Sequence, residues 1–238
     1  MFRTTRWSLV IGTRPQTESG RAALEALCRT YRSPVVAYLR ARGHAPSDAD
    51  DLAQAFFEQL LLRRTHAVAD PARGRFRTFL LTALKHFLAN EREREHALKR
   101  GGDRLIVPLE PELEPDPGDD SPASPESVFE RDYALTVISR AVERLRAEAV
   151  GAGKATLFEK VSPFLLEPPD QSEYAVLAEQ LEMRRNTLAV AIHRLRNRLR
   201  DMVRRELQDT VDDDATLEIE MGMLRKALAG RERSGATA

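Results

Sequence analysis

Basic side chains are concentrated in two short parts of the sequence, and their chemistry is that of phosphate binding. Between residues 184 and 205 eight arginines stand against one acid, and between residues 73 and 104 nine basic residues stand against four acids. Guanidinium groups match phosphate oxygens, and basic patches of this density attract nucleic acid. The alternative is that both blocks are merely solvated helix faces, and composition alone leaves the two explanations about equally open.

The sequence offers no constellation typical of an enzyme. It has no glycine-rich phosphate loop, no His-x-x-x-His pair and no nucleophile elbow. Cys28 is the only cysteine, which excludes a disulfide framework or a multi-cysteine metal site, and we interpret it as a buried, inert thiol. His86 has no Cys, His or Asp three or four residues away that could share a metal ion. We therefore expect a protein that is not an enzyme and has no catalytic residue, metal or cofactor.

Helical periodicity dominates the parts of the chain that carry these residues, and strand-like alternation is scarce. Apolar residues recur at helical spacing from Phe76 to Glu95, and again from Pro125 to about Ala149. Ser33 with Pro34, and Ser47 with Asp50, have the form of helix starts. The sequence predicts an all-α fold.

An acidic, proline-rich stretch separates the two basic blocks. Residues 105 to 132 hold nine acids and one base, and six prolines fall between residues 108 and 125. Such a composition cannot bury enough apolar surface to order itself. We predict two small helical domains and this linker between them, with the boundaries 1–100 for the first domain, 101–126 for the flexible linker, 127–211 for the second domain and 212–238 for a C-terminal helical extension.

The second basic block has the pattern of a helix-turn-helix. A short helix ending at Leu181 is followed by a turn and by a second helix from about Asn186, whose apolar stripe is Leu188, Ile192, Leu195 and Leu199. In a recognition helix the exposed N-terminal positions read base edges, and later arginines hold phosphates. The predicted readers are Thr187, Val190 and either His193 or Arg194. The predicted phosphate anchors are Arg196, Arg198 and Arg200, and Arg185 and Asn197 complete the predicted DNA-binding face.

These motifs resemble those of the sigma-70 family of RNA polymerase sigma factors, of the small extracytoplasmic-function type. Leu177 to Met183, followed by Ala191 to Arg200, resembles sigma region 4. Ser47 to Phe57 is similar to region 2.2, and Arg73 to Lys85 with Asn90 to Arg94 is similar to regions 2.3 and 2.4. The motifs stand in the family's order, divided by a linker, and the resemblance covers nearly the whole chain.

The resemblance implies a sigma factor that binds core RNA polymerase and starts transcription through contacts with the minus-10 and minus-35 promoter elements. It implies as partners promoter DNA and the β′ clamp helices and β flap of core polymerase, with an anti-sigma factor or other regulator left open. The implied polymerase-binding residues are Asp48, Asp51, Leu52, Gln54, Phe56 and Glu58, although Leu52 and Phe56 could equally be core. The implied minus-10 DNA-binding residues are Arg73, Arg75, Arg77, Lys85, His86, Arg92 and Arg94.

The sequence departs from the family pattern at several positions. Phe79, His86 and Asn90 stand where the family commonly has Trp, Asn and Asp. In the helix-turn-helix, Glu182 replaces the turn glycine, and Arg184 stands where a serine usually caps the second helix.

A C-terminal helix from Ala215 to Ala229 is predicted beyond region 4, with Leu217, Met221, Leu224 and Leu228 inward. We expect it to pack on the second domain or to contact a regulator, and its acidic start could compete with DNA for the arginine-rich helix. No apolar run is long enough to span a membrane, and no secretory signal is recognisable, so we expect a cytoplasmic protein with no membrane partner. The alternative function is a stand-alone helix-turn-helix regulator that does not engage polymerase.

Overall fold

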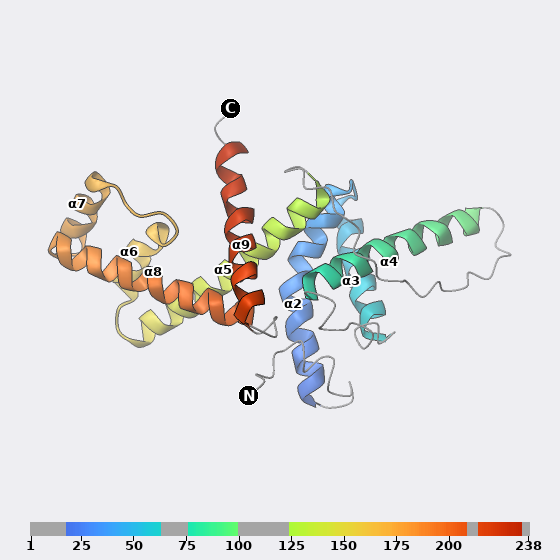
Figure 1. Ribbon diagram of the computed structural model, residues 1–238, viewed down its shortest axis with the longest axis horizontal. Helices are drawn as coiled ribbons and strands as arrows, with labels where there is room; N and C mark the ends of the chain where they lie inside the picture. Colours follow the sequence, from blue (N-terminus) through green and yellow to red (C-terminus); the bar gives the residue numbers. More distant parts are fainter. Residues whose placement is uncertain (1–17, 63–75, 100–123, 209–213, 235–238) are drawn as a thin grey trace. The chain divides into compact units, whose positions relative to one another are not determined.

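The computed structural model describes residues 18–62, 76–99, 124–208 and 214–234 (Figure 1). Within those ranges every regular element is a helix, which confirms the predicted all-α fold. The helices are α2 (Glu18–Ala41), α3 (Pro46–Leu62), α4 (Phe76–Lys99), α5 (Pro125–Gly151), α6 (Ala155–Val161), the 3₁₀ turn η3 (Ser162–Phe164), α7 (Gln171–Gln180), α8 (Arg185–Gln208) and α9 (Asp214–Ser234). None of these helices is both long and apolar enough to cross a membrane.

The chain divides into two compact units. Unit 1 comprises residues 1–134 together with 209–238, and unit 2 comprises residues 135–208. The division falls inside α5, whereas the sequence analysis placed it in the acidic segment before that helix. Most of that segment lies outside the described residues, but its last residues already belong to the start of α5.

Aromatic rings hold the core of unit 1 together. Tyr31 of α2 is stacked on Tyr133 of α5, with ring centroids 5.1 Å apart, and meets Phe76 of α4 edge-on at 5.1 Å. Phe56 of α3 packs against Phe87 of α4 at 5.6 Å. Burial of each such side chain contributes about 1.5–3 kcal/mol, so these contacts are the main attraction between the four helices.

Two predicted helix starts in unit 1 are wrong. Ser33 and Pro34 lie inside α2, which begins at Glu18. Pro34 removes one helical hydrogen bond, but the buried side chains on either side of it, Tyr31 and Val35, hold the helix through this point. α3 begins at Pro46, one residue before the proposed cap Ser47, because a proline suits the first helical position, where its missing N–H is not needed.

α5 begins where predicted, and a serine caps it. The Ser124 hydroxyl accepts a hydrogen bond from the Ser127 amide at 3.1 Å, and the Ser124 carbonyl accepts one from the Val128 amide at 3.0 Å. One of its apolar residues, Leu135, is nevertheless 37% exposed. The periodicity is blurred because α5 contributes to the cores of both units and buries more than one face.

The core of unit 2 is built around the stripe of α8. Leu188, Ile192 and Leu199 are buried, as predicted, and Leu195 is partly buried. α5 and α6 supply the facing apolar residues, among them Leu145 and Phe158. The inward-facing half of α8 is thereby fixed, which determines the side chains that its other half presents to solvent.

The C-terminal helix α9 belongs to unit 1. Leu217, Met221 and Leu224 are buried as predicted, but unit 1 buries them, not the domain that carries the helix-turn-helix. The expectation that this helix packs on the second domain was therefore wrong. Helical periodicity identifies the face that a helix buries but not the surface that covers it.

Candidate nucleic-acid interface

α7 and α8 of unit 2 are joined by a short turn, at the place where the sequence predicts a helix-turn-helix. Asp170 begins α7 with a capping box: its carboxylate accepts hydrogen bonds from the Ser172 and Glu173 amides at 2.8 Å, and the Glu173 carboxylate accepts one from the Asp170 amide at 2.8 Å. The donors from Ser172 and Glu173 lower the pKa of Asp170. Leu177 and Ala178 of α7 are buried.

The turn between the two helices is a Schellman motif with a glutamate in the left-handed position. The Met183 amide donates to the Ala178 carbonyl at 2.9 Å and the Glu182 amide donates to the Glu179 carbonyl at 3.1 Å. Glu182 has a φ of 52°, the only positive φ of a non-glycine residue within the described ranges. This is the position where the family commonly has glycine, so the turn keeps its geometry at the cost of backbone strain.

The N-terminal half of α8 presents its predicted DNA-reading side chains to solvent. Arg185, Thr187, His193 and Arg194 are exposed, and Val190 is 50% exposed. Thr187, Val190, His193 and Arg194 lie on the face opposite the buried stripe, whereas Arg185, in the first turn, stands beside that stripe in the helical projection. This arrangement could bring polar groups and one apolar side chain to base edges in a major groove.

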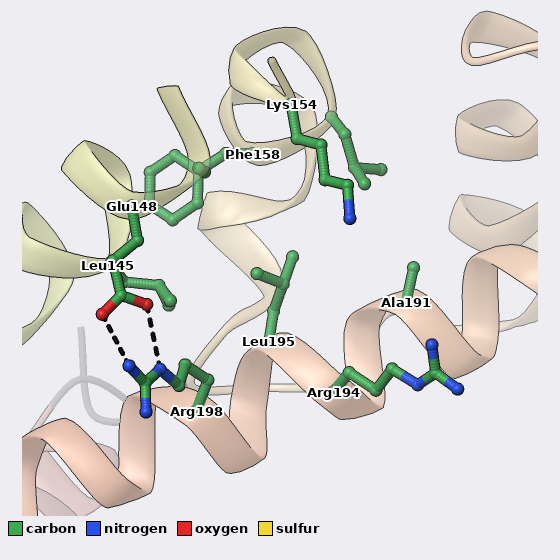
Figure 2. A pocket seen from close by; sticks show the side chains of 10 residues that line it. Leu145, Glu148, Lys154, Phe158, Ala191, Arg194, Leu195 and Arg198 are labelled. Carbon is green, nitrogen blue, oxygen red and sulfur yellow. Dashed lines mark hydrogen bonds and ion pairs between the residues drawn. The ribbon is translucent and has the colours of Figure 1, made fainter. Parts of the chain in front are cut away.

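Two of the predicted phosphate anchors on α8 have partners within unit 2. Arg198 donates two hydrogen bonds to the Glu148 carboxylate on α5, at 2.9 and 2.6 Å (Figure 2). This pairing lowers the pKa of Glu148. Arg196 donates to the Leu166 carbonyl at 3.2 Å. Both guanidinium groups are thereby held on the protein's own surface.

Arg200 is the predicted anchor best placed to reach a phosphate. It is exposed and donates a hydrogen bond to the amide oxygen of the neutral Asn197 at 3.2 Å. The Asn197 amide nitrogen lies 3.3 Å from Nδ1 of His193. This short chain of contacts orders the middle of the exposed face without neutralising Arg200.

A cavity of about 290 Å³ lies beside Arg198, between α5, α6 and α8 (Figure 2). Leu145, Phe158 and Leu195 line its apolar part, and Lys154 and Arg194 stand among its polar residues. The paired Glu148 and Arg198 form another part of its lining.

The basic residues of α4 in unit 1 differ widely in their surroundings. The Arg77 side chain is 3% exposed and forms ion pairs with Glu130 of α5 at 2.7 Å and Glu220 of α9 at 3.3 Å. Its guanidinium group also lies over the Tyr133 ring, 5.6 Å from the centroid. Burial opposes the charge of Arg77, but the two glutamates outweigh this effect and raise the pKa of Arg77.

The other predicted minus-10 residues are more accessible. Lys85 is partly buried and pairs with Glu126 of α5 at 3.0 Å, and His86 is partly exposed. Arg92 and Arg94 are exposed, and Arg94 pairs with Glu91 of its own helix at 2.7 Å. Arg73 and Arg75 lie outside the described residues. The described part of the minus-10 prediction thus contains one buried cation and several exposed ones.

The predicted polymerase-binding residues lie along α3. Asp48, Asp51, Gln54 and Glu58 are exposed, and Leu52 is partly exposed. Phe56, by contrast, is 2% exposed and packs on Phe57 and Phe87. Its placement on a docking surface is therefore corrected to the core, because a helix this apolar must turn its largest rings toward its neighbours. The remaining five residues form the α3 surface.

The sequence analysis missed the acidic partners of these cations. Glu130 and Glu220 are both far from Arg77 in sequence, and Glu148 is fifty residues from Arg198. Charge patterning detects pairs within one helix, but these pairs depend on tertiary packing, so nothing in the sequence pattern could have located them. In the described parts of the chain, no group of three His, Cys, Asp or Glu side chains could hold a metal ion.

One part of unit 1 matches a known protein family. Residues 27–97 match the family model described as Sigma-70 region 2, a range that runs from within α2 through α3 and into α4. The match concerns this region 2 segment of the chain. The comparisons with curated proteins and with solved structures gave no match.

Proposed function

We propose that this protein is a sigma factor of the extracytoplasmic-function type, which binds core RNA polymerase in the cytoplasm and directs it to promoters. The observation that carries the proposal is the region 2 match, which includes α3 and most of α4. The helix-turn-helix in unit 2, outside the matched range, supports it because a sigma factor needs a second DNA-binding element.

The α3 surface is the proposed contact with the β′ clamp helices. Its exposed acids, Asp48, Asp51 and Glu58, flank the partly exposed Leu52. Acidic residues around an apolar anchor give a protein interface both orientation and buried area. The β flap is the proposed partner of unit 2, in keeping with the resemblance to region 4.

The proposed promoter contacts come from both units. α4 faces the minus-10 element with His86, Arg92 and Arg94, and α8 faces the minus-35 element with Thr187, Val190 and Arg194 near the base edges. Two weak contacts on one polymerase raise each other's effective concentration, so promoter spacing adds to specificity. Arg200 anchors a phosphate, whereas Arg196 and Arg198 contribute less because unit 2 already binds them.

The decisive experiment is binding of the purified chain to bacterial core RNA polymerase. Leu52→Asp places a charge in the α3 surface, and Ile219→Asp makes the same kind of change at a 50% exposed position of α9. The wild type and Ile219→Asp are expected to bind tightly and Leu52→Asp to bind far more weakly, with all three folded by circular dichroism. No binding by the folded wild type would refute the proposal, and DNA binding in that case would favour the stand-alone regulator.

The DNA-binding side of the proposal has its own test. Arg200→Ala is expected to weaken binding to minus-35 DNA on all sequences and to reduce the slope of log affinity against log salt by about one unit. Arg198→Ala serves as the matched control, with a smaller effect because Glu148 competes for its guanidinium group. Equal effects of the two substitutions would contradict this assignment of roles.

A further inference from the structure

Acidic side chains from α5 and α9 pair with two of the cations that the resemblance to region 2 assigns to minus-10 DNA. Arg77 pairs with Glu130 and Glu220, and Lys85 pairs with Glu126. Both cations lie on α4, and all three acids come from elements outside the range that matches region 2. The match ends at residue 97, so the covering elements are additions to that domain.

The contact of α9 with Arg77 combines a buried ion pair and a thioether contact. The Arg77 side chain is 3% exposed, the Glu220 side chain is 3% exposed, and the two meet at 3.3 Å. Met223 of α9 lies against the same guanidinium group, with 3.0 Å between its sulfur and a guanidinium nitrogen. One turn of α9 therefore supplies both a carboxylate and a thioether to Arg77.

Apolar residues on the same face hold α9 in this position. Leu217 is fully buried, and Met221 and Leu224 are nearly so. Glu220 lies between them in the sequence, so the turn of α9 that buries its apolar face also brings the carboxylate to Arg77. The apolar stripe of α9 packs on the rest of unit 1, and the one buried acid within the stripe, Glu220, meets the buried cation of Arg77.

We infer that α9, with the start of α5, is an internal ligand of unit 1 that competes with the promoter's single strand for the basic surface of α4. Glu220 and Glu126 take the places that phosphates would take on Arg77 and Lys85. DNA reaches Arg77 only when α9 moves away from it, and reaches Lys85 only when it displaces Glu126 of α5. The inference rests on the proposed function, because it assumes that α4 faces DNA.

If α9 and α5 compete with DNA, neutralising Glu126 and Glu220 should raise the affinity for DNA more than neutralising acids elsewhere in the chain. Neutralising any acid raises affinity for DNA slightly through long-range attraction, so a matched control is required. Glu143 and Glu167 are exposed and belong to unit 2, and neither takes part in the proposed contacts. The variant Glu143→Gln/Glu167→Gln thus changes the net charge of the chain as much as Glu126→Gln/Glu220→Gln does.

The experiment measures binding of the full-length chain to a labelled single-stranded DNA of mixed sequence, by fluorescence anisotropy at fixed salt. Relative to the control variant, Glu126→Gln/Glu220→Gln is expected to bind at least about fivefold more tightly, as a coupling between two ligands for one site requires. Affinities within about twofold of each other would overturn the inference.

A second measurement covers the case in which the substitutions disturb folding. Hydrogen exchange of the α9 amides around Leu217 to Leu224 is followed on the wild type with and without the oligonucleotide. Competition predicts that protection falls when the DNA is bound, and unchanged protection at saturation overturns the inference. Binding to core polymerase is measured in parallel and tests the proposed function separately. If the chain binds polymerase but α9 stays protected in the presence of DNA, the proposed function stands and the competition is refuted.

Discussion

Glu182 holds a left-handed backbone conformation that, in the described ranges, only glycines share, so replacing it with glycine should stabilise the protein. Two glycines hold the position equivalent to that of Glu182 after their own helices. They are Gly43 after α2, with a φ of 93°, and Gly153 after α5, with a φ of 70°. At each of the three positions the next amide donates to a carbonyl five residues earlier, at 3.2 Å after Gly43, 2.8 Å after Gly153 and 2.9 Å after Glu182. The motifs differ mainly in whether a Cβ is present.

The size of the effect follows from two opposing terms. A left-handed conformation costs an L-residue about 1–2 kcal/mol, and Glu182→Gly removes this strain. Glycine also gives the unfolded chain more conformational freedom, which costs about 0.4–1 kcal/mol. The free energy of unfolding should therefore rise by roughly 0.5–1 kcal/mol.

The two glycines provide the reverse experiment. A Cβ at Gly43 or Gly153 would meet no atom within 4 Å, so any loss on substitution comes from the backbone alone. Gly43→Ala and Gly153→Ala should each lower the free energy of unfolding by a similar roughly 0.5–1 kcal/mol, by the same two terms with the opposite sign.

Urea denaturation followed by circular dichroism measures all three variants, with the midpoint compared at constant slope. A lower midpoint for Glu182→Gly would refute the reasoning, since it would show that the glutamate side chain stabilises the turn more than its backbone strain destabilises it. Unchanged midpoints for both alanine variants would show that the left-handed positions carry no strain.

Three further predictions concern other parts of the chain. Arg77→Met should lower the free energy of unfolding by about 3–5 kcal/mol in urea denaturation, because it leaves the buried Glu220 carboxylate without its cation, and a loss below about 1 kcal/mol would contradict this. Burial raises the pKa of the Cys28 thiol to about 11, so iodoacetamide at pH 8 should alkylate it about a hundredfold more slowly than in the urea-unfolded chain; equal rates would refute the burial. The lowered pKa of Asp170 stabilises unit 2 above the unfolded-state pKa of this carboxyl, and this stabilisation should fall as the pH drops through the lower folded-state pKa, whereas Asp170→Asn should show a weaker acid dependence in thermal melts.

Local patterns predicted most of the helices and much of the second unit's core. The stripe Leu188, Ile192 and Leu199 was read from spacing, because one face of a long amphipathic helix determines its own burial. The start of α5 followed from Ser124 and Pro125, whose capping chemistry involves only neighbouring residues. Predictions of this kind succeed because every atom that matters lies within one turn.

The failures have a common physical cause, which is competition between local and tertiary preferences. Pro34 signals a helix start locally, yet buried neighbours carry α2 through it. Phe56 fits an apolar anchor on a docking surface as well as it fits a core, and only the position of Phe87 decides between them. Arg77 likewise has the sequence context of a DNA contact, and its burial depends on Glu220, more than a hundred residues later.

The composition of unit 1 from both ends of the chain has a consequence for synthesis on the ribosome. Residues 135–208 leave the exit tunnel as one continuous stretch and can fold as soon as they emerge. The nascent unit 1 must wait through their translation before α9 arrives, with Arg77 paired to Glu130 but not yet to Glu220. A message that ends after codon 208 therefore encodes a complete unit 2 and an unfinished unit 1, with the apolar seat of α9 open to chaperones.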